Sequence, residues 1–190
     1  MSLGARDSTP VLALRALTTR VVLLIRAPHR ATVWREDAVI GSAVTLARDA
    51  TDTMFLVSCV GKKGAAPSRA RDLYTSDWFH KARAYVEARG DRWFILSAEC
   101  GLLHPDTVVA PYERTLNRMG IAERRAWAAR VLAALEPQLA GVGRVVVLAG
   151  ERYREFILGR LRELTPVIEI PLAGLRIGEQ LGWLARHQRA

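Results

Sequence analysis

Lysine and cysteine are scarce in this sequence. Only three of the 28 basic residues are lysines, namely Lys62, Lys63 and Lys81, so arginine is the default cation. The two cysteines, Cys59 and Cys100, form no CxxC pair and no Cys/His ligand spacing, so we expect neither a bound metal nor another cofactor. We interpret both as reduced, partly buried side chains of a cytoplasmic protein. Because both follow expected strands, a redox or nucleophilic role beside a cleft is the alternative.

Long apolar runs are also missing. A membrane-spanning helix needs about 20 apolar residues, whereas the run at 21–25 is short and Arg15 interrupts the apolar stretch before it. We therefore expect no cleavable signal at the start, and the sequence predicts a soluble, cytoplasmic protein without a membrane partner. The GxxxxGK[ST] spacing does not occur around Gly61, which argues against ATP hydrolysis by a P-loop.

Positive charge is in excess. The formal net charge is +9 and the sequence pI is about 10.5. Clustered cations gain free energy by releasing counterions from a polyphosphate, so this balance favours a polyanion as partner. Charge alone does not choose among DNA, RNA and acidic lipid. Residues 1–53 carry seven arginines against five acidic residues, so most of the excess belongs to residues 54–190.

The order of apolar segments predicts the fold. Half of the residues are apolar, which is enough for a sizeable core. One strand-like run begins at residue 55 and others span 93–98, 144–149 and 166–170; each precedes a polar turn, and helical periodicity returns after each turn. This alternation predicts a three-layer α/β/α sandwich with a mainly parallel central sheet over residues 54–190. Residues 1–53 are interpreted as an accessory segment with a β-hairpin around the turn at 27–30.

Polar residues follow the first two runs. Ligands of parallel sheets bind beyond the carboxyl ends of the strands, which is where Ser58, Lys62 and Lys63 are expected. Lysine offers a compact charge suited to a single phosphate oxygen, although a solvated turn explains the pair equally well. Glu99 follows the second run, where it either forms an ordinary ion pair or takes part in catalysis.

Aromatic residues lie near the same expected edge. Ser76 is a plausible N-cap for the helix that follows, which places Tyr74 just ahead of the helix. Tyr74 there either stacks on a base or belongs to the core. Tyr112 directly follows Pro111 in an extended connector. Glu151 begins a later helix, where a carboxylate is favourable even without catalysis.

Four segments taken together resemble a bacterial domain family of unknown function. They are Ser58-Cys59 with Lys62-Lys63, 73–76 with Phe79, 96–103, and Pro111-Tyr112 with Thr115. This family is similar to the peroxide-stress protein YaaA and to the amino-terminal domain of archaeosine synthase, within the uracil-DNA-glycosylase-like superfamily. The resemblance covers residues 54–184 and implies a uracil-DNA-glycosylase-like fold. The site lining that it implies is Ser58, Cys59, Lys62, Tyr74, Ser76, Ser97, Gly101, Tyr112 and Thr115.

The function implied by the resemblance is hydrolysis of the N-glycosidic bond of a damaged or modified base in DNA, in repair or antiphage defence. Such a site needs a carboxylate near the sugar, donors at the base and an aromatic platform. We assign Glu99 or Glu151 to the first role, Ser58 to the second and Tyr74 or Tyr112 to the third, with Lys62 and Lys63 on phosphate. The alternatives are a non-catalytic DNA-binding stress protein, and an enzyme acting on nucleotides or deazaguanine-type bases.

Overall fold

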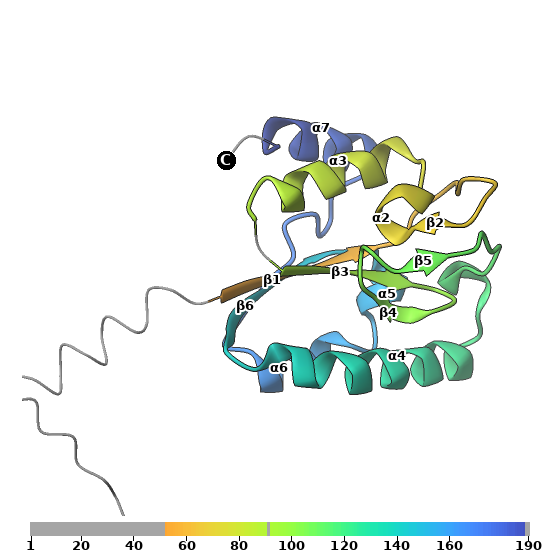
Figure 1. Ribbon diagram of the computed structural model, residues 1–190. Helices are drawn as coiled ribbons and strands as arrows, with labels where there is room; N and C mark the ends of the chain where they lie inside the picture. The colour runs from red at the N-terminus through yellow and green to blue at the C-terminus, as the bar shows by residue number, and fades with distance from the viewer. Residues whose placement is uncertain (1–51, 91, 189–190) are drawn as a thin grey trace, which may run out of the picture. The chain divides into compact units, whose positions relative to one another are not determined.

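The central feature of the fold is a five-stranded sheet. The computed structural model describes residues 52–90 and 92–188, so the β-hairpin expected around residues 27–30 lies outside the described residues. The strand order is β4-β3-β1-β6-β7 (Figure 1). The strands are β1 (Asp52–Ser58), β3 (Arg92–Ser97), β4 (Gly101–Leu103), β6 (Val142–Leu148) and β7 (Val167–Glu169). All pairs are parallel except β3 with β4.

Helices cover both faces of this sheet. The pair α3 (Asp77–Glu87) and α7 (Ile177–Arg186) lies on one face, and α4 (Ile121–Leu135) and α6 (Leu158–Leu164) lie on the other (Figure 1). The predicted three-layer α/β/α sandwich with a mainly parallel sheet is therefore confirmed. Within 52–90 and 92–188, no helix is both long enough and apolar enough to cross a membrane.

Short elements connect these layers. They are β2 (Ser68–Arg69), α2 (Ala70–Leu73), β5 (Val108–Val109), the 3-10 helices η2 (Leu116–Arg118) and η3 (Glu136–Leu139), and α5 (Glu151–Arg154). Strands β2 and β5 pair with each other in an antiparallel ribbon. Strand β5 leads into the segment of Pro111 and Tyr112 that was expected to be an extended connector.

The pattern of buried residues explains why the main strand and the main helix form where they do. The sequence Met54–Val57 of β1 is almost completely buried, as is typical of a strand covered on both faces. In α4, Trp127, Val131 and Leu135 recur at four-residue spacing and are buried, so the helix packs on the sheet through one apolar face.

Two predicted elements differ in detail. The segment after Ser97, expected as a loop, turns back through Gly101 at φ +77° and forms the antiparallel strand β4. The helix expected to begin at Glu151 is divided into α5 and α6. At the division Ile157 N donates to Arg154 O at 3.2 Å, which is the tighter 3-10 spacing.

The connections create a crevice between β1 and β6. After β1 the chain passes through α3 to β3 on one side, whereas after β6 it passes through α5 and α6 to β7 on the other side. Adjacent parallel strands whose connections leave in opposite directions mark a topological switch point, and ligands of open α/β sheets bind there. The fold therefore places its natural binding crevice beyond Ser58 and Leu148.

Candidate functional site

A pocket of about 320 Å³ lies at this switch point. Its lining comes from the segments that follow β1 and β6 and from α3, η2 and α7. The lining residues are Ser58, Cys59, Val60, Gly61, Trp78, Thr115, Asn117, Gly150, Glu151, Arg152, Tyr153, Ile177 and Gln180. Five separate segments of the chain thus meet at one concave site.

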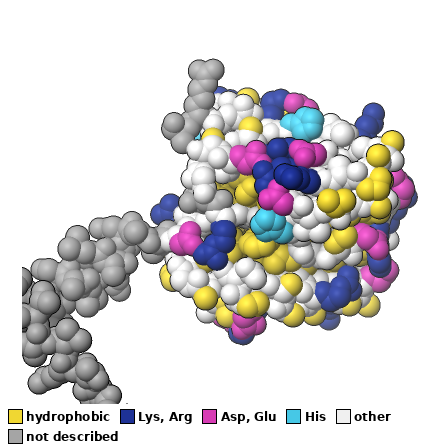
Figure 2. Space-filling model, viewed as in Figure 1, with side chains coloured by type: hydrophobic (Ala, Val, Ile, Leu, Met, Phe, Trp, Pro, Cys, Tyr) yellow, Lys and Arg dark blue, Asp and Glu magenta, His cyan; other side chains and the backbone are white. Residues whose placement is uncertain are grey.

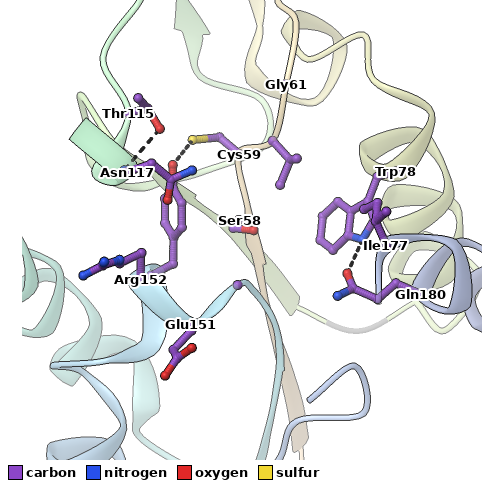
Figure 3. A pocket seen from close by; sticks show the side chains of 13 residues that line it. Ser58, Cys59, Gly61, Trp78, Thr115, Asn117, Glu151, Arg152, Ile177 and Gln180 are labelled. Carbon is purple, nitrogen blue, oxygen red and sulfur yellow. Dashed lines mark hydrogen bonds between the residues drawn. The ribbon is translucent and has the colours of Figure 1, made fainter. Parts of the chain in front are cut away.

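The pocket has two unlike walls. In Figure 3, Trp78, Ile177 and Gln180 form one side, and Thr115 and Arg152 lie across from them. Trp78 is 5% exposed and Ile177, at the start of α7, is 61% exposed, so the first wall runs from a buried indole to an apolar rim. The opposite wall carries hydroxyl, carboxamide and guanidinium groups.

The Gln180 carboxamide is held in one orientation. Trp78 Nε1 donates to Gln180 Oε1 at 2.9 Å, and Gln180 Nε2 donates to the Leu175 carbonyl at 2.8 Å. An indole N–H can only donate and a backbone carbonyl can only accept, so the amide oxygen and nitrogen cannot exchange places. The wall therefore presents a fixed pattern of polar atoms.

Behind the pocket, hydroxyl groups surround the sulfur of Cys59. Tyr112 Oη donates to Cys59 Sγ at 3.5 Å, and Tyr153 Oη lies 3.3 Å from the same sulfur. Tyr112 Oη is also 2.9 Å from both Tyr74 Oη and Ser97 Oγ. This network joins the ends of β1 and β3 to the connector before η2 and to α5.

The tyrosines of this network keep their protons at neutral pH. Burial raises the pKa of Tyr74 to about 12. Burial, followed by the nearby Cys59 thiol, also raises the pKa of Tyr112 and of Tyr153 above the ordinary tyrosine value. The Thr115 hydroxyl acts in the opposite direction on the pKa of Tyr153. These hydroxyls can therefore both donate and accept hydrogen bonds.

The loop after β1 is fixed by Ser76. Ser76 Oγ donates to the Val60 carbonyl at 2.7 Å and accepts from Phe79 N at 3.2 Å, so one hydroxyl caps α3 and ties it to the loop. Gly61 has φ +78°, and a Cβ there would lie 2.9 Å from Ser76 Cβ. The predicted N-cap is confirmed, and it positions the pocket edge.

A family model matches residues 54–186 and is described as a family of unknown function, DUF6884. The match spans well over half of the chain. The chain belongs to the DUF6884 family. The whole pocket of this DUF6884 domain, from Ser58 to Gln180, lies within the matched residues. No curated protein and no solved structure matches the chain.

Four of the residues predicted from sequence line the DUF6884 pocket, namely Ser58, Cys59, Thr115 and Glu151. Three others, Tyr74, Ser97 and Tyr112, lie behind it in the hydroxyl network. Tyr74 is 0% exposed, so its ring packs in the core.

The remaining predicted residues of this DUF6884 domain lie elsewhere. Lys62 is exposed, and Lys63 Nζ lies 4.3 Å from the centre of the Tyr112 ring in a cation–π contact. Glu99 is exposed and its nearest basic partner is Arg114, at 3.8 Å. Gly101 begins β4, and Cys100 is exposed and does not line the pocket.

Sequence reasoning missed three lining residues, Trp78 and Gln180 on one wall and Asn117 on the other. Trp78 comes two residues after the N-cap Ser76, so its place in the first turn of α3 was a usable signal. Asn117 and Gln180 reach the pocket only because η2 and α7 pack beside it, which no local pattern reveals. In the described part of this DUF6884 domain, no cluster of three or more His, Cys, Asp or Glu residues is arranged to hold a metal ion.

Proposed function

We propose that this protein hydrolyses the N-glycosidic bond of a damaged or modified base in DNA, with the pocket at the switch point as the base site. The observation that carries the proposal is the convergence of one aromatic wall, two carboxamides and one carboxylate on a single concave site. The proposal includes a relation to the uracil-DNA-glycosylase-like superfamily, to which the four motif segments point.

The walls suit a planar heterocycle. Trp78 offers an apolar aromatic surface, while Asn117 and Gln180 offer carboxamide donors and acceptors for the edge of a base. An extrahelical base is read in this way, by hydrogen bonds to its edge and by contact with aromatic or apolar side chains. The pocket volume of about 320 Å³ lies at the lower end of the range usual for small-ligand sites.

Glu151 is the carboxylate of the proposed reaction. It lines the pocket at the start of α5. A water molecule attacks C1′ of the sugar, the bond between C1′ and the base nitrogen breaks, and the electron pair leaves with the base. The carboxylate accepts the proton of the water and stabilises the positive charge that develops on the sugar.

One cation lines the pocket, and three others are chain neighbours of lining residues. Arg152 lines it, and its acidic neighbour Glu155 is 3.9 Å away. Exposed Lys62, Arg118 and Arg176 are each adjacent in the chain to a lining residue. Such cations suit the phosphates on either side of an extrahelical nucleotide.

Other parts of the surface are less suited to a phosphate backbone. On the face in Figure 2, basic and acidic side chains are interspersed. Ion pairs such as Arg71 with Asp106 at 2.8 Å and Arg83 with Asp72 at 2.6 Å neutralise cations of α2 and α3. The cations next to the pocket are therefore the favoured phosphate contacts.

A non-catalytic DNA-binding protein is the second candidate. Glu151 occupies the first turn of α5, where a carboxylate is favourable without any reaction. Under this alternative the pocket holds a damaged base and no bond is broken.

Incubation with DNA oligonucleotides that carry a panel of modified bases, followed by mass spectrometry of released free base, tests the proposal. We expect release from at least one substrate. The Glu151→Gln variant should lower the rate by about 10²–10⁴-fold, the usual contribution of a general base, because its amide cannot take the proton. Exposed Glu113, which does not line the pocket, gives the matched control Glu113→Gln with an unchanged rate.

Two results would change the assignment. Release of no base from any substrate, together with DNA binding, would favour the non-catalytic alternative. Full activity of Glu151→Gln, together with loss of activity in Glu99→Gln, would assign the role of general base to Glu99.

A further inference from the structure

Two buried hydroxyls have no hydrogen-bond partner among the residues that the structure describes. They belong to Ser58, which is 0% exposed, and Thr165, which is 4% exposed. Burying a hydroxyl without a partner costs folding free energy, so such groups are rare in native proteins. Only Ser58 lines the pocket. A ligand in the pocket can therefore supply the missing partner of Ser58, whereas Thr165 lies outside its reach.

Ser58 is fixed at the back of the pocket. It is the last residue of β1, which pairs with β3 and β6 on its two sides. In Figure 3, Ser58 lies between the wall of Trp78 and Gln180 and the wall of Thr115 and Asn117. Since no described residue pairs with this hydroxyl, an atom that enters the pocket is the candidate for its partner.

The second polar group that a ligand in the pocket can meet is the carboxamide of Gln180. Its oxygen is turned toward Trp78 Nε1, and one hydrogen of its Nε2 is used by the Leu175 carbonyl. The other Nε2 hydrogen forms no further hydrogen bond with a described residue. Because the amide cannot flip, the group offers a second N–H in addition to the Ser58 O–H.

We propose that Ser58 Oγ and Gln180 Nε2 together recognise the carbonyl oxygen of an oxo-substituted base. This inference rests on the proposed function only in taking the pocket as the base site. A carbonyl oxygen has two lone pairs and can accept from both donors. An amino group at the same ring position would place its own N–H groups opposite the Gln180 N–H. Both donors would then stay buried and unpaired, and a site rejects an analogue that leaves its donors unpaired.

Hypoxanthine and adenine are suitable probes, since they have the same ring system and carry an oxo or an amino group at the same carbon. Calorimetric titration of the full chain with each free base is expected to show at least tenfold tighter binding of hypoxanthine. In Ser58→Ala this preference should fall to less than threefold. The thermal unfolding midpoint of the unliganded variant should stay equal or rise, because the change removes an unpaired buried hydroxyl.

Thr165→Val is the matched control. It removes the other unpaired buried hydroxyl, so its unfolding midpoint should also stay equal or rise, and its preference for hypoxanthine should match that of the unchanged chain. The pair of variants therefore separates recognition in the pocket from a general effect of removing a buried polar group.

The inference is overturned if the unchanged chain binds neither base, binds both equally, or keeps its preference in Ser58→Ala. A lowered unfolding midpoint in Ser58→Ala overturns it as well, since the hydroxyl would then have a structural partner. Its failure is distinguishable from failure of the proposed hydrolysis. A preference for hypoxanthine that depends on Ser58, without release of any base from DNA, supports the recognition and refutes the reaction. Release of a base without a preference for hypoxanthine supports the reaction and refutes the recognition.

Discussion

Gly61 determines the path of the chain where β1 ends and the pocket begins. Its φ of +78° lies in the left-handed region, and a Cβ at this position would meet Ser76 Cβ at 2.9 Å. Gly61→Ala therefore combines backbone strain with a steric clash against the N-cap of α3. We expect it to lower the free energy of unfolding by about 2–3 kcal/mol, measured by urea denaturation.

Gly141 is the matched control for this substitution. It has the same φ of +78°, but no atom lies within 4 Å of a Cβ built there. Gly141→Ala should show the strain alone, about 1 kcal/mol. Equal losses in the two variants would contradict a clash at Ser76.

At the scale of single residues, the position of a side chain at the end of a strand could be predicted and its hydrogen bonds could not. Ser58, Cys59 and Glu151 lie at or just beyond the ends of apolar runs, so the general rule for parallel sheets placed them at the correct edge. Tyr74 and Tyr112 were expected as stacking platforms, but their hydroxyls pair with each other at 2.9 Å behind the pocket. That pairing joins residues 38 positions apart in the sequence, which local patterns do not encode.

Helix α3 depends on a single hydroxyl at its start. Ser76 Oγ both accepts from Phe79 N and donates to the Val60 carbonyl. Ser76→Ala removes both bonds, so we expect a loss of about 1–2 kcal/mol in the free energy of unfolding. The neighbouring exposed Thr75 provides the control Thr75→Ala, which should change stability by less than about 0.5 kcal/mol.

If the two variants have the same stability, the capping bond contributes nothing measurable. Because the loop of Val60 and Gly61 lines the pocket, Ser76→Ala should also weaken binding of whichever base the site takes. Thr75→Ala should not.

At the scale of elements, long elements with a repeated apolar spacing could be predicted from the sequence, whereas short elements could not. The face of α4 that carries Trp127, Val131 and Leu135 can be predicted, because its spacing repeats over several turns. Strand β4 has only three residues and depends on pairing with β3, so no pattern of its own marks it. The break between α5 and α6 likewise lies within a continuous apolar periodicity.

The tyrosine network makes the stability of the whole molecule sensitive to alkaline pH. The pKa of Tyr74 is about 12 in the folded chain, against about 10 in an unfolded chain. Between these values the unfolded chain releases a proton that the folded chain keeps, so rising pH favours unfolding. The contribution is fully present below about pH 10 and is lost as the pH approaches about 12, at about 1.4 kcal/mol per pH unit for this tyrosine.

Tyr112 and Tyr153 act in the same direction, since burial also raises the pKa of each. Urea denaturation at a series of pH values between 9.5 and 11.5 should therefore show a steep fall in the free energy of unfolding. In Tyr112→Phe the slope should be shallower, because one titrating hydroxyl is gone. Parallel curves for the two proteins would refute the role of the network.

The pocket takes residues from both ends of the described domain, and this has a consequence for a chain that is still being synthesised. Ser58 and Trp78 are made early, but Ile177 and Gln180 belong to α7, which packs on α3. A ribosome-bound chain that stops before α7 exposes one side of the crevice and has no second wall. A ligand of the pocket can therefore stabilise only a chain in which α7 has already been synthesised and has packed on α3.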